Sequence, residues 1–386
     1  MNYKYGKNFW FLSLSLFFFF TSFNLILPKL NDFITSLGGA DIKGLIITLF
    51  TISAAVSRPF SGKLSDTIGR KKVIYIGIIF SVIISLMYPF CYSVLFFLTL
   101  RFFHGFSAGF TPTGTTALLT DLIPANERGR AMGIAGAFIS LGFGVGWYLG
   151  PDICMTFGMD ALFIISGFTA LISGVLLLKV EETLKNPQKF DGSQLQVQWN
   201  DVIEPSVIPA AVVMVLTASC TGLIFVLTPD ISKFLGIEEG DFFLYYVLST
   251  IFVRLFSSSL SDRIGRRETM LIGASLLFLS MILLSKVDSE KSFILAAIVF
   301  GLATGVSSPT LFAWTADLSH IKRRGVGAGT LFIALEAGIM LGSTSTIFTY
   351  NNTPESIQQV FLFGIIMSFL AILYLLWHKV YRTSDF

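Results

Sequence analysis

Long apolar stretches recur along the whole chain, and they constrain its fold more than any other feature. A helix needs about 20 apolar residues to cross the ~30 Å hydrocarbon layer of a membrane. Lipid-facing backbone groups must bond within their own segment, and the period-two alternation of a membrane barrel is absent, so each stretch should be a helix. We therefore expect twelve transmembrane helices at about Phe9–Leu27, Gly44–Phe60, Val73–Phe90, Val94–Leu119, Ala131–Leu149, Leu162–Leu178, Val207–Leu227, Phe242–Phe256, Met270–Leu284, Phe293–Thr315, Val326–Phe348 and Val360–Trp377.

Composition supports a membrane protein over a soluble one. Hydrophobic residues make up 53% of the chain and charged residues only 13%, against roughly 25% charged in soluble domains. The net charge of +3 comes without a basic stripe interleaved with aromatics, so we expect no nucleic-acid partner. The first apolar stretch is longer than a signal-peptide core of about 7–15 residues, and no small-residue cleavage site follows it, so we keep it as a spanning helix.

No cofactor or metal site is expected from the motifs of the chain. The three cysteines, Cys91, Cys154 and Cys220, have no metal-type spacing and are interpreted as small hydrophobic residues. The run from Gly105 to Gly109 fits the Gly-x-Ser-x-Gly pattern of hydrolases, but it lies inside an apolar stretch instead of at a strand-to-helix turn. We therefore do not expect an enzyme.

The placement of basic residues predicts the orientation in the membrane. With the amino terminus inside, nineteen of the 27 Lys and Arg residues fall in cytoplasmic segments. The exceptions are five outer residues, Lys29, Lys43, Lys233, Lys286 and Lys291, and three within helices, Arg58, Arg101 and Arg254. Because Lys and Arg accumulate in cytoplasmic loops, both termini should lie in the cytoplasm.

The two halves of the sequence repeat each other at a shift of 196 positions. Residues 58–70 match residues 254–266 at nine of thirteen positions. The pairs include Arg58 and Arg254, Asp66 and Asp262, Gly69 and Gly265, Arg70 and Arg266, and further along Asp121 and Asp317, Arg128 and Arg324, Gly142 and Gly338. A shift of six helices, an even number, gives both halves the same orientation, as in transporters built from parallel repeats.

This repeat predicts the architecture and the domains. We expect an all-α membrane protein with two six-helix bundles related by a pseudo-two-fold axis along the membrane normal. The bundles should comprise residues 1–180 and 205–386, joined by a polar cytoplasmic linker at 181–204. A solute site near the midplane between such bundles opens alternately to either side when they rock.

Two related motifs carry a family resemblance. The segment after the second stretch reads Gly62-x-x-x-Asp66-x-x-Gly69-Arg70-Lys71, and Ser258-x-x-x-Asp262-x-x-Gly265-Arg266-Arg267 repeats it with Ser for the first Gly. Both resemble the signature loop of the major facilitator superfamily. The resemblance implies that each Asp meets a helix amino terminus of the opposite bundle, where the helix dipole favours an anion. It also implies a charge network for conformational gating that includes Asp121, Arg128, Asp317 and Arg324. The simpler alternative, basic residues that only retain loops in the cytoplasm, leaves the paired Asp and Gly unexplained.

The fourth and fifth stretches carry further motifs. Arg101-x-x-His104 resembles a superfamily motif with an Arg inside the membrane, about 10 Å deep at 1.5 Å per residue. It predicts substrate binding or, through His104, proton coupling, with helix bracing as the alternative. Gly142-x-x-x-Gly146-x-x-x-Gly150-Pro151 is a stripe for close helix approach and is similar to the superfamily's antiporter motif. In this chain Cys154 and Met155 replace the Gly pair that follows in that motif.

One acidic residue lies near the predicted midplane, and it is the best candidate for proton coupling. Glu336 is about ten residues into the eleventh stretch, where an ionised carboxylate is costly and protonation is favoured. A static ion-pair role is the alternative. The first stretch carries Asn24 where many drug exporters of the superfamily have an acid, which argues against lipophilic cations as solutes. Further candidates for the solute site are Phe103, Phe106, Phe110, Trp147, Tyr245 and Trp314.

These features together predict a secondary active transporter. We expect proton-coupled efflux of a small solute by rocker-switch alternating access, in a monomer of the bacterial inner membrane whose other partners are protons and the lipid bilayer. A proton-coupled importer of a small nutrient is the alternative on the same fold. A receptor built on a transporter scaffold is a third, which the intact signature loops and the lack of an added soluble domain disfavour.

Overall fold

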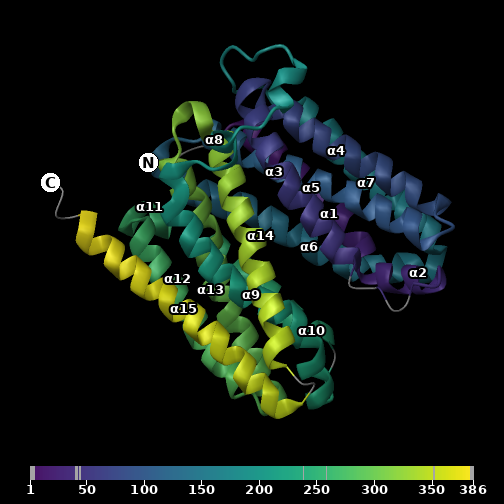
Figure 1. Ribbon diagram of the computed structural model, residues 1–386, viewed down its shortest axis with the longest axis vertical. Helices are drawn as coiled ribbons and strands as arrows, with labels where there is room; N and C mark the ends of the chain where they lie inside the picture. Colours follow the sequence, from purple (N-terminus) through teal and green to yellow (C-terminus); the bar gives the residue numbers. More distant parts are fainter. Residues whose placement is uncertain are drawn as a thin grey trace. The chain divides into compact units, whose positions relative to one another are not determined.

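In the computed structural model the described residues are 5–39, 42, 45–237, 239–257, 259–350 and 353–382, and helices are the only regular secondary structure among them. Lys43, Gly44 and Ser258, used in the sequence interpretation, lie outside them. The first half contains α1 (Lys7–Ile26), η1 (Leu27–Lys29), α2 (Leu30–Ser36), α3 (Leu45–Thr67), α4 (Arg70–Met87), η3 (Tyr88–Phe90), α5 (Val94–Leu122), η4 (Ala125–Glu127), α6 (Arg128–Phe157) and α7 (Met159–Leu178) (Figure 1).

The linker region and the second half continue in the same way. They contain η5 (Gly192–Leu195), α8 (Trp199–Val202), η6 (Pro205–Val207), α9 (Ile208–Leu235), α10 (Glu239–Ser257), α11 (Leu260–Ile264), α12 (Arg266–Ser285), α13 (Glu290–Leu318), η7 (Ile321–Arg323), α14 (Arg324–Thr349) and α15 (Pro354–Arg382). In the described part of the chain, 11 helices are long and apolar enough to cross a membrane. The eighth predicted span corresponds to α10, which is not among those 11.

Several helices extend beyond the apolar stretches that predicted them. The stretch 44–60 was expected to end before the signature loop, but α3 continues to Thr67, so Gly62 and Asp66 lie in its last turns and not in a loop. Likewise α6 begins at Arg128 and continues through Pro151 to Phe157. Helical hydrogen bonds connect backbone groups of either polar or apolar residues, so a helix does not end where hydropathy falls. A proline removes only one of these bonds, and membrane helices tolerate it.

The described chain forms two compact units. Unit 1 contains residues 1–124, 138–205 and 319–332, and unit 2 contains residues 125–137, 206–318 and 333–386. The units differ from the predicted domains in exchanging two short segments, the first residues of α6 and the first residues of α14. The predicted bounds 1–180, 181–204 and 205–386 follow the sequence repeat and stay a prediction.

Helix packing within each unit repeats the same pattern. In unit 1, α5 packs against α3 and α4, and α7 packs against α1 and α4. In unit 2, α13 packs against α10 and α12, and α15 packs against α9 and α12. Each pair in one unit has its counterpart 196 residues along the chain, so the repeat seen in sequence is also a repeat of packing. The cores are apolar, with Phe97 and Phe163 in unit 1 and Phe242 and Phe293 in unit 2 completely buried.

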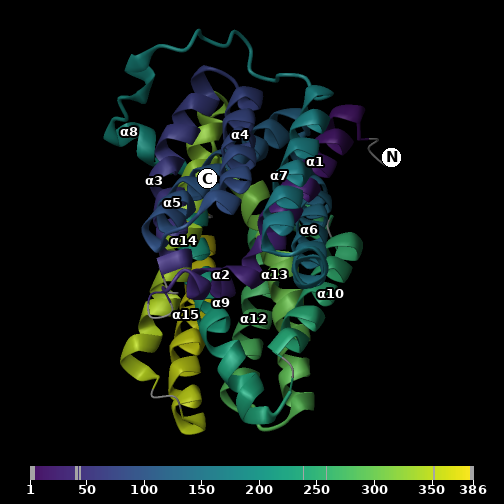
Figure 2. The same ribbon diagram turned by 90° about the vertical axis from the view of Figure 1, so that its right-hand side faces the viewer.

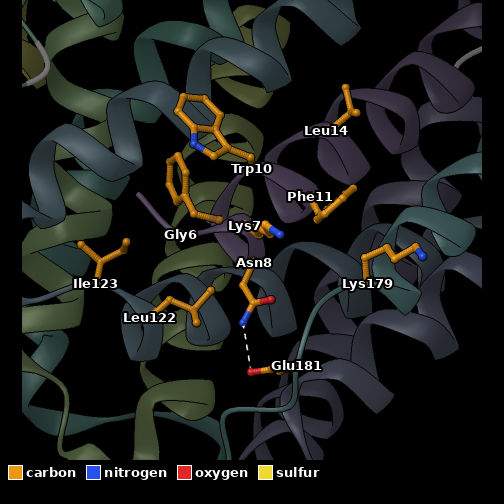
Figure 3. Close-up of a pocket in the computed structure, with 11 residues that line it drawn as sticks. Gly6, Lys7, Asn8, Trp10, Phe11, Leu14, Leu122, Ile123, Lys179 and Glu181 are labelled. Carbon is orange, nitrogen blue, oxygen red and sulfur yellow. Dashed lines mark hydrogen bonds between the residues drawn. The ribbon is translucent and has the colours of Figure 1, made fainter. Parts of the chain in front are cut away.

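The linker after α7 belongs to unit 1. Figure 2 shows it passing over the ends of α3 and α4 to reach the short helix α8, which contacts α3. A pocket of about 950 Å³ lies near the start of the linker, where the first turn of α1, the end of α5 and the residues just after α7 meet (Figure 3).

Candidate conformational gate and intramembrane polar residues

The carboxylate of Asp66, in the last turn of α3, is bound to the beginning of α14. It accepts hydrogen bonds from the backbone N–H groups of Gly325 (2.8 Å) and Val326 (2.9 Å). These are the second and third residues of α14, and the first N–H groups of any helix have no partner within the helix. The carboxylate therefore satisfies two of these donors and also lies at the positive end of the helix dipole.

Two glycines make this approach possible. A Cβ atom on Gly325 would lie 2.4 Å from the carbonyl oxygen of Gly62 and 2.8 Å from the Cβ of Ser65. A Cβ on Gly62 would lie 3.1 Å from the carbonyl oxygen of Gly325. Only glycine at position 325 fits the present distance between α3 and α14, which explains its place in the sequence better than helix propensity does.

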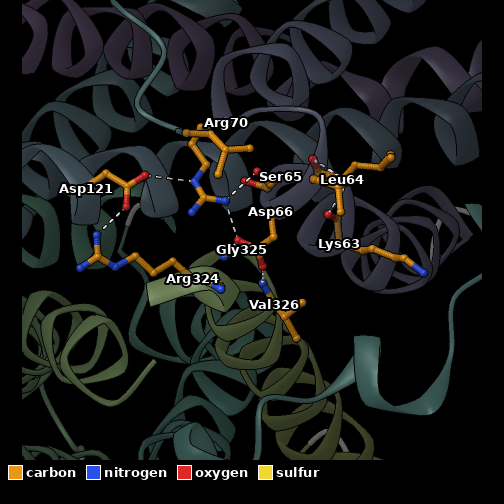
Figure 4. Close-up of polar contacts among 12 residues, drawn as sticks. Lys63, Leu64, Ser65, Asp66, Arg70, Asp121, Arg324, Gly325 and Val326 are labelled. Atoms are coloured by element: carbon orange, nitrogen blue, oxygen red, sulfur yellow. Dashed lines mark hydrogen bonds and ion pairs between the residues drawn. The ribbon is translucent and has the colours of Figure 1, made fainter. Parts of the chain in front are cut away.

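Arginines complete this contact in unit 1 (Figure 4). The guanidinium of Arg70, which is 1% exposed, binds the carboxylates of Asp66 (2.5 Å) and Asp121 (3.1 Å). Arg324, the first residue of α14, binds the other oxygen of Asp121 (2.5 Å). We call Asp66, Arg70, Asp121, Arg324, Gly325 and Val326 the first clasp, because together they join the ends of α3 and α5 to the start of α14.

Unit 2 contains the same arrangement built from the repeated residues. Asp262 accepts hydrogen bonds from the backbone N–H groups of Gly129 and Arg130, both 2.8 Å, at the start of α6. Asp262 also pairs with Arg266. The carboxylate of Asp317 binds Arg266 (2.8 Å) and Arg128 (2.6 Å). We call Asp262, Arg266, Asp317, Arg128, Gly129 and Arg130 the second clasp. Every member has its counterpart in the first clasp at the shift of 196.

Glycines at the starts of α4 and α12 explain another pair of repeated residues. Gly69 has φ +128° and Gly265 has φ +103°, values that residues with a side chain rarely adopt. A Cβ on Gly69 would also lie 2.4 Å from a carboxylate oxygen of Glu182, and one on Gly265 would lie 2.5 Å from Glu268. The backbone conformation therefore requires glycine at both positions, and a side chain there would also displace the nearby carboxylate.

Glu182 is a residue that the sequence analysis missed. Its carboxylate accepts hydrogen bonds from the backbone N–H groups of Arg70 (3.1 Å) and Lys71 (3.0 Å), and so caps α4. The next residue, Thr183, donates from its hydroxyl to Asp121 (2.8 Å). The start of the linker is thus bound to the first clasp. The sequence signal was that Gly69, the N-cap residue of α4, has no side chain, so the first backbone N–H groups of α4 need an acceptor from another part of the chain.

The last basic residue of each motif has a different role from the others. The ammonium of Lys71 donates to the carbonyl oxygen of Leu178 (3.3 Å) at the end of α7, where the helix dipole favours a cation. Arg267 pairs with its neighbour Glu268 (2.7 Å). The resemblance to the signature loop implied that both residues belong to the gating network, and their contacts lie beside that network, at the end of α7 and the start of α12.

The linker also contacts α3 and the start of α14, close to the first clasp but not at its members. Lys63 Nζ donates to the carbonyl oxygen of Gln196 and to the carboxylate of Asp201, both at 2.8 Å. Arg323 pairs with Glu204 (2.6 Å), whose backbone N–H donates to the hydroxyl of Thr330 in α14 (2.9 Å). Partial burial raises the pKa of the Asp201 carboxyl, but the hydrogen bond from Lys63 and the nearby cations outweigh it and leave the pKa below its ordinary value.

Two further arginines in the membrane-spanning segments occupy equivalent positions. Arg58 of α3, 3% exposed, donates to the carbonyl oxygen of Gly109 (3.2 Å), and its guanidinium lies 4.2 Å from the ring centre of Phe332 in α14. Arg254 of α10 donates to the carbonyl oxygen of Gly136 in α6. Positions 332 and 136 are related by the repeat. The sequence assigned neither arginine a role. In the structure Arg58 contacts α14, the helix that Asp66 binds, and Arg254 contacts α6, the helix that Asp262 binds.

Arg101 and His104 lie inside unit 1, buried among α3, α4 and α5. The guanidinium of Arg101 donates to the carbonyl oxygen of Ile46 (3.3 Å), lies 4.7 Å from the ring centre of Phe50 and is 3.5 Å from the hydroxyl of Tyr88. His104 is hydrogen-bonded through Nδ1 to Tyr88 (3.1 Å) and through Nε2 to Ser81 (3.4 Å). Both side chains are at most 1% exposed. Their partners account for the cost of burying them.

The other candidates for the solute site fall into separate groups. Trp147 donates from its indole N–H to the amide oxygen of Asn24 (3.2 Å), so the structure brings these two together. Phe103 and Phe106 form a second group of aromatic rings on α5, 6.3 Å apart. Trp314 lies in unit 2, 6% exposed, against His378.

The glycine stripe of α6 packs directly on the backbone of α1. Cβ atoms on Gly142 and Gly150 would lie 2.6 Å from the carbonyl oxygen of Phe17 and 2.1 Å from that of Leu25. In unit 2 a Cβ on Gly342 would lie 1.9 Å from the carbonyl oxygen of Ser219 in α9. The stripe therefore lets the two helices approach closely in both units. An additional meaning of Gly150-Pro151 for antiport stays a prediction.

Glu336 lies in the middle of α14, which spans 26 residues, and is half-buried. Its depth in the membrane stays a prediction. Among the described residues no group of three or more His, Cys, Asp and Glu side chains is arranged to hold a metal ion.

Comparison with known proteins identifies the family. The family model described as Major Facilitator Superfamily matches residues 10–248 and 210–385. The chain belongs to this superfamily. Members of this superfamily are transporters, which confirms the expected family and the expectation that the protein is not an enzyme. The protein is a multi-pass membrane protein that carries small solutes.

Related sequences include transporters from bacteria and archaea. This superfamily member is 23% identical over 383 residues to an uncharacterized MFS-type transporter of Methanocaldococcus jannaschii, an alignment that covers 95% of this chain and 97% of the relative. It is 27% identical over 220 residues to the quinolone resistance protein NorA of Staphylococcus aureus, covering 55% of this chain and 56% of NorA.

Solved structures confirm the predicted fold class. The human organic anion transporter MFSD10 (TETRAN) matches with a TM-score of 0.84 at 18% identity and covers 96% of this chain and 99% of that chain. The proton:xylose symporter XylE matches with a TM-score of 0.77 at 14% identity and covers 94% of each chain. At these identities the likeness concerns the fold alone.

Proposed function

We propose that this transporter exports a small solute in exchange for protons by alternating access. The observation that carries the proposal is the pair of clasps. Each clasp holds the start of one helix, α14 or α6, against a helix from the other half of the sequence. Opening requires the start of α14 to leave Asp66 and the start of α6 to leave Asp262. Two equivalent sets of breakable charge contacts suit a protein that alternates between two states.

The same reasoning supports the orientation. In each unit the clasp lies at helix ends that are rich in basic residues, so we place these ends and both termini in the cytoplasm of a bacterial cell, with the protein in the inner membrane as a monomer. In this orientation the clasps close the cytoplasmic side, and their release lets a solute enter from within.

The direction of transport is inferred from two features. One is the likeness to NorA, a quinolone resistance protein. The other is the Gly150-Pro151 end of the α6 stripe, which resembles the antiporter motif. Quinolones and organic anions, taken from the names of NorA and MFSD10, are the first two solute classes to test.

Glu336 is the proposed proton carrier. It is half-buried in the middle of a spanning helix, where a charged carboxylate is costly and a neutral one is not. Binding a proton from outside and releasing it inside would couple the gradient to solute exit. The burial of Arg101 and His104 favours their bracing role, so we assign them to the support of α3, α4 and α5. Solute contact falls to Asn24, Trp147, Phe103, Phe106 and Trp314.

Proton flux in inverted vesicles tests this proposal. Vesicles that have acidified by respiration should lose part of their pH gradient when a transported quinolone or organic anion is added. Glu336→Gln should abolish the response, whereas Glu290→Gln, at the exposed start of α13, should keep it. Solute movement without proton movement would refute coupling. Solute uptake driven into cells by an inward proton gradient would favour the alternative, a proton-coupled importer on the fold shared with XylE.

A further inference from the structure

The pocket at the start of α1 is separate from the clasps and has no role in the proposed transport cycle. It is lined by residues 6–11 and Leu14 of the α1 region, by Leu122 and Ile123 at the end of α5, and by Lys179 and Glu181 after α7 (Figure 3). With a volume of about 950 Å³ it lies at the upper limit of the range of small-molecule sites. All its walls belong to unit 1.

The pocket carries more positive than negative charge, since two lysines and one acid line it. Lys7 and Lys179 are both exposed, and the side-chain hydrogen bond that the described residues form in this pocket, from Asn8 to Glu181, involves neither ammonium group. The one acid in the pocket, Glu181, accepts a hydrogen bond from Asn8 (3.4 Å). The first turn of α1 adds to the positive field, since its N-cap residue is Gly6, which has no side chain to bind the free N–H groups.

The rest of the wall is apolar and suited to a lipid. Phe11, Leu14 and Leu122 are half-buried, and Trp10 is 46% exposed. Tryptophan concentrates at the boundary between the headgroups and the hydrocarbon, and lysine extends its ammonium group from apolar surroundings toward that boundary. A free inorganic anion would use the two lysines but leave this apolar wall against water.

We propose that this pocket binds an anionic phospholipid of the cytoplasmic leaflet. Lys7 and Lys179 contact the phosphate, and Trp10, Phe11 and Leu14 contact the first part of the acyl chains. The site is connected to the gate through the chain itself, because Glu181 directly precedes Glu182 and Thr183, which bind the first clasp. An occupied pocket therefore holds the start of the linker in the position that caps α4.

Quenching of tryptophan fluorescence by brominated lipids tests the proposal on the full chain in detergent. Brominated phosphatidylglycerol should quench Trp10 at lower concentration than brominated phosphatidylcholine, and Trp10→Phe should remove that component of the signal. Lys7→Gln with Lys179→Gln should raise the half-quenching concentration about fivefold for each lysine removed. Lys7→Arg with Lys179→Arg should restore it. The matched control is Lys185→Gln with Lys189→Gln, two exposed linker residues outside the pocket.

Two results would overturn the proposal. Equal quenching by the two lipids, or the same half-quenching concentration in the Lys7→Gln, Lys179→Gln variant as in the native chain, would show that the pocket does not select an anionic lipid. Displacement of the lipid by millimolar inorganic phosphate would show a site for free anions instead. Failure of proton coupling in the vesicle assay would leave the lipid result unaffected, so the two proposals are judged separately.

Discussion

Removing the charge of Asp66 should open the first clasp. In the native chain this carboxylate accepts two backbone hydrogen bonds from α14, at 2.8 and 2.9 Å, and a third from Arg70 at 2.5 Å. Asp66→Asn keeps the shape of the side chain but removes its charge and directs an NH₂ group at one of the donors. The variant should therefore fold and yet hold the start of α14 less tightly.

The size of the effect follows from these contacts. A hydrogen bond to a charged group contributes about 1.5–3 kcal/mol, and one between neutral groups about 0.5–1.5 kcal/mol. In Asp66→Asn one backbone hydrogen bond from α14 becomes a bond between neutral groups and the other is lost, so the contact with α14 should weaken by about 3 kcal/mol. Because every 1.4 kcal/mol is a factor of ten, the ratio of closed to open molecules should fall about a hundredfold.

Distances between spin labels would detect this change. Labels on cysteines at Lys72 and Lys322, both exposed and both in unit 1, report the separation of α4 from the segment before α14. Cys91, Cys154 and Cys220 are first replaced by alanine. Asp66→Asn should shift the distance distribution to longer values, whereas Asp32→Asn, at an exposed acid in the first turn of α2, should not. An unchanged distribution in Asp66→Asn would refute the assignment of the first clasp as a gate.

Three further outcomes are expected. Gly325→Ala should give the same longer label distance, because its Cβ would lie 2.4 Å from the Gly62 carbonyl oxygen, and Gly192→Ala, with open space around it, should not; equal distances in both variants would contradict the close approach. Gly146→Ala should lower the melting temperature in detergent through overpacking of about 1–3 kcal/mol, since its Cβ would lie 2.6 Å from that of Asn24, whereas Gly6→Ala should leave it unchanged. The pKa of Asp201 is lower in the folded chain than its ordinary value of 3.8, so its contribution to linker docking is present above 3.8 and is lost as the pH falls through the lower folded pKa. A spin label at Gln196 should therefore become mobile only in that acidic range. In Lys63→Gln the label should be mobile already at neutral pH.

The sequence alone was sufficient for the family, the helices and the repeat. Each spanning helix was visible because a membrane requires about 20 consecutive apolar residues, which is a local property of the chain. The equivalence of Asp66 and Asp262 could be predicted because the repeat places the same residue types at the same spacing in both halves. The resemblance to the signature loop added the prediction that each Asp meets a helix start, and the contacts to Gly325 and Gly129 agree with it.

Partners distant in sequence were decided by the tertiary structure. Asp66 and Gly325 are 259 positions apart, and no local pattern links Glu182 to the start of α4 or Arg254 to Gly136. The ends of α3 and α6 also differed from the hydropathy pattern, since backbone hydrogen bonds continue through polar residues. Arg101 and His104 looked alike as candidates for a solute site, but only packing determines whether a polar side chain on a helix faces its neighbours or an opening. That choice depends on how whole helices are rotated against one another, and hydropathy along a single chain does not encode it.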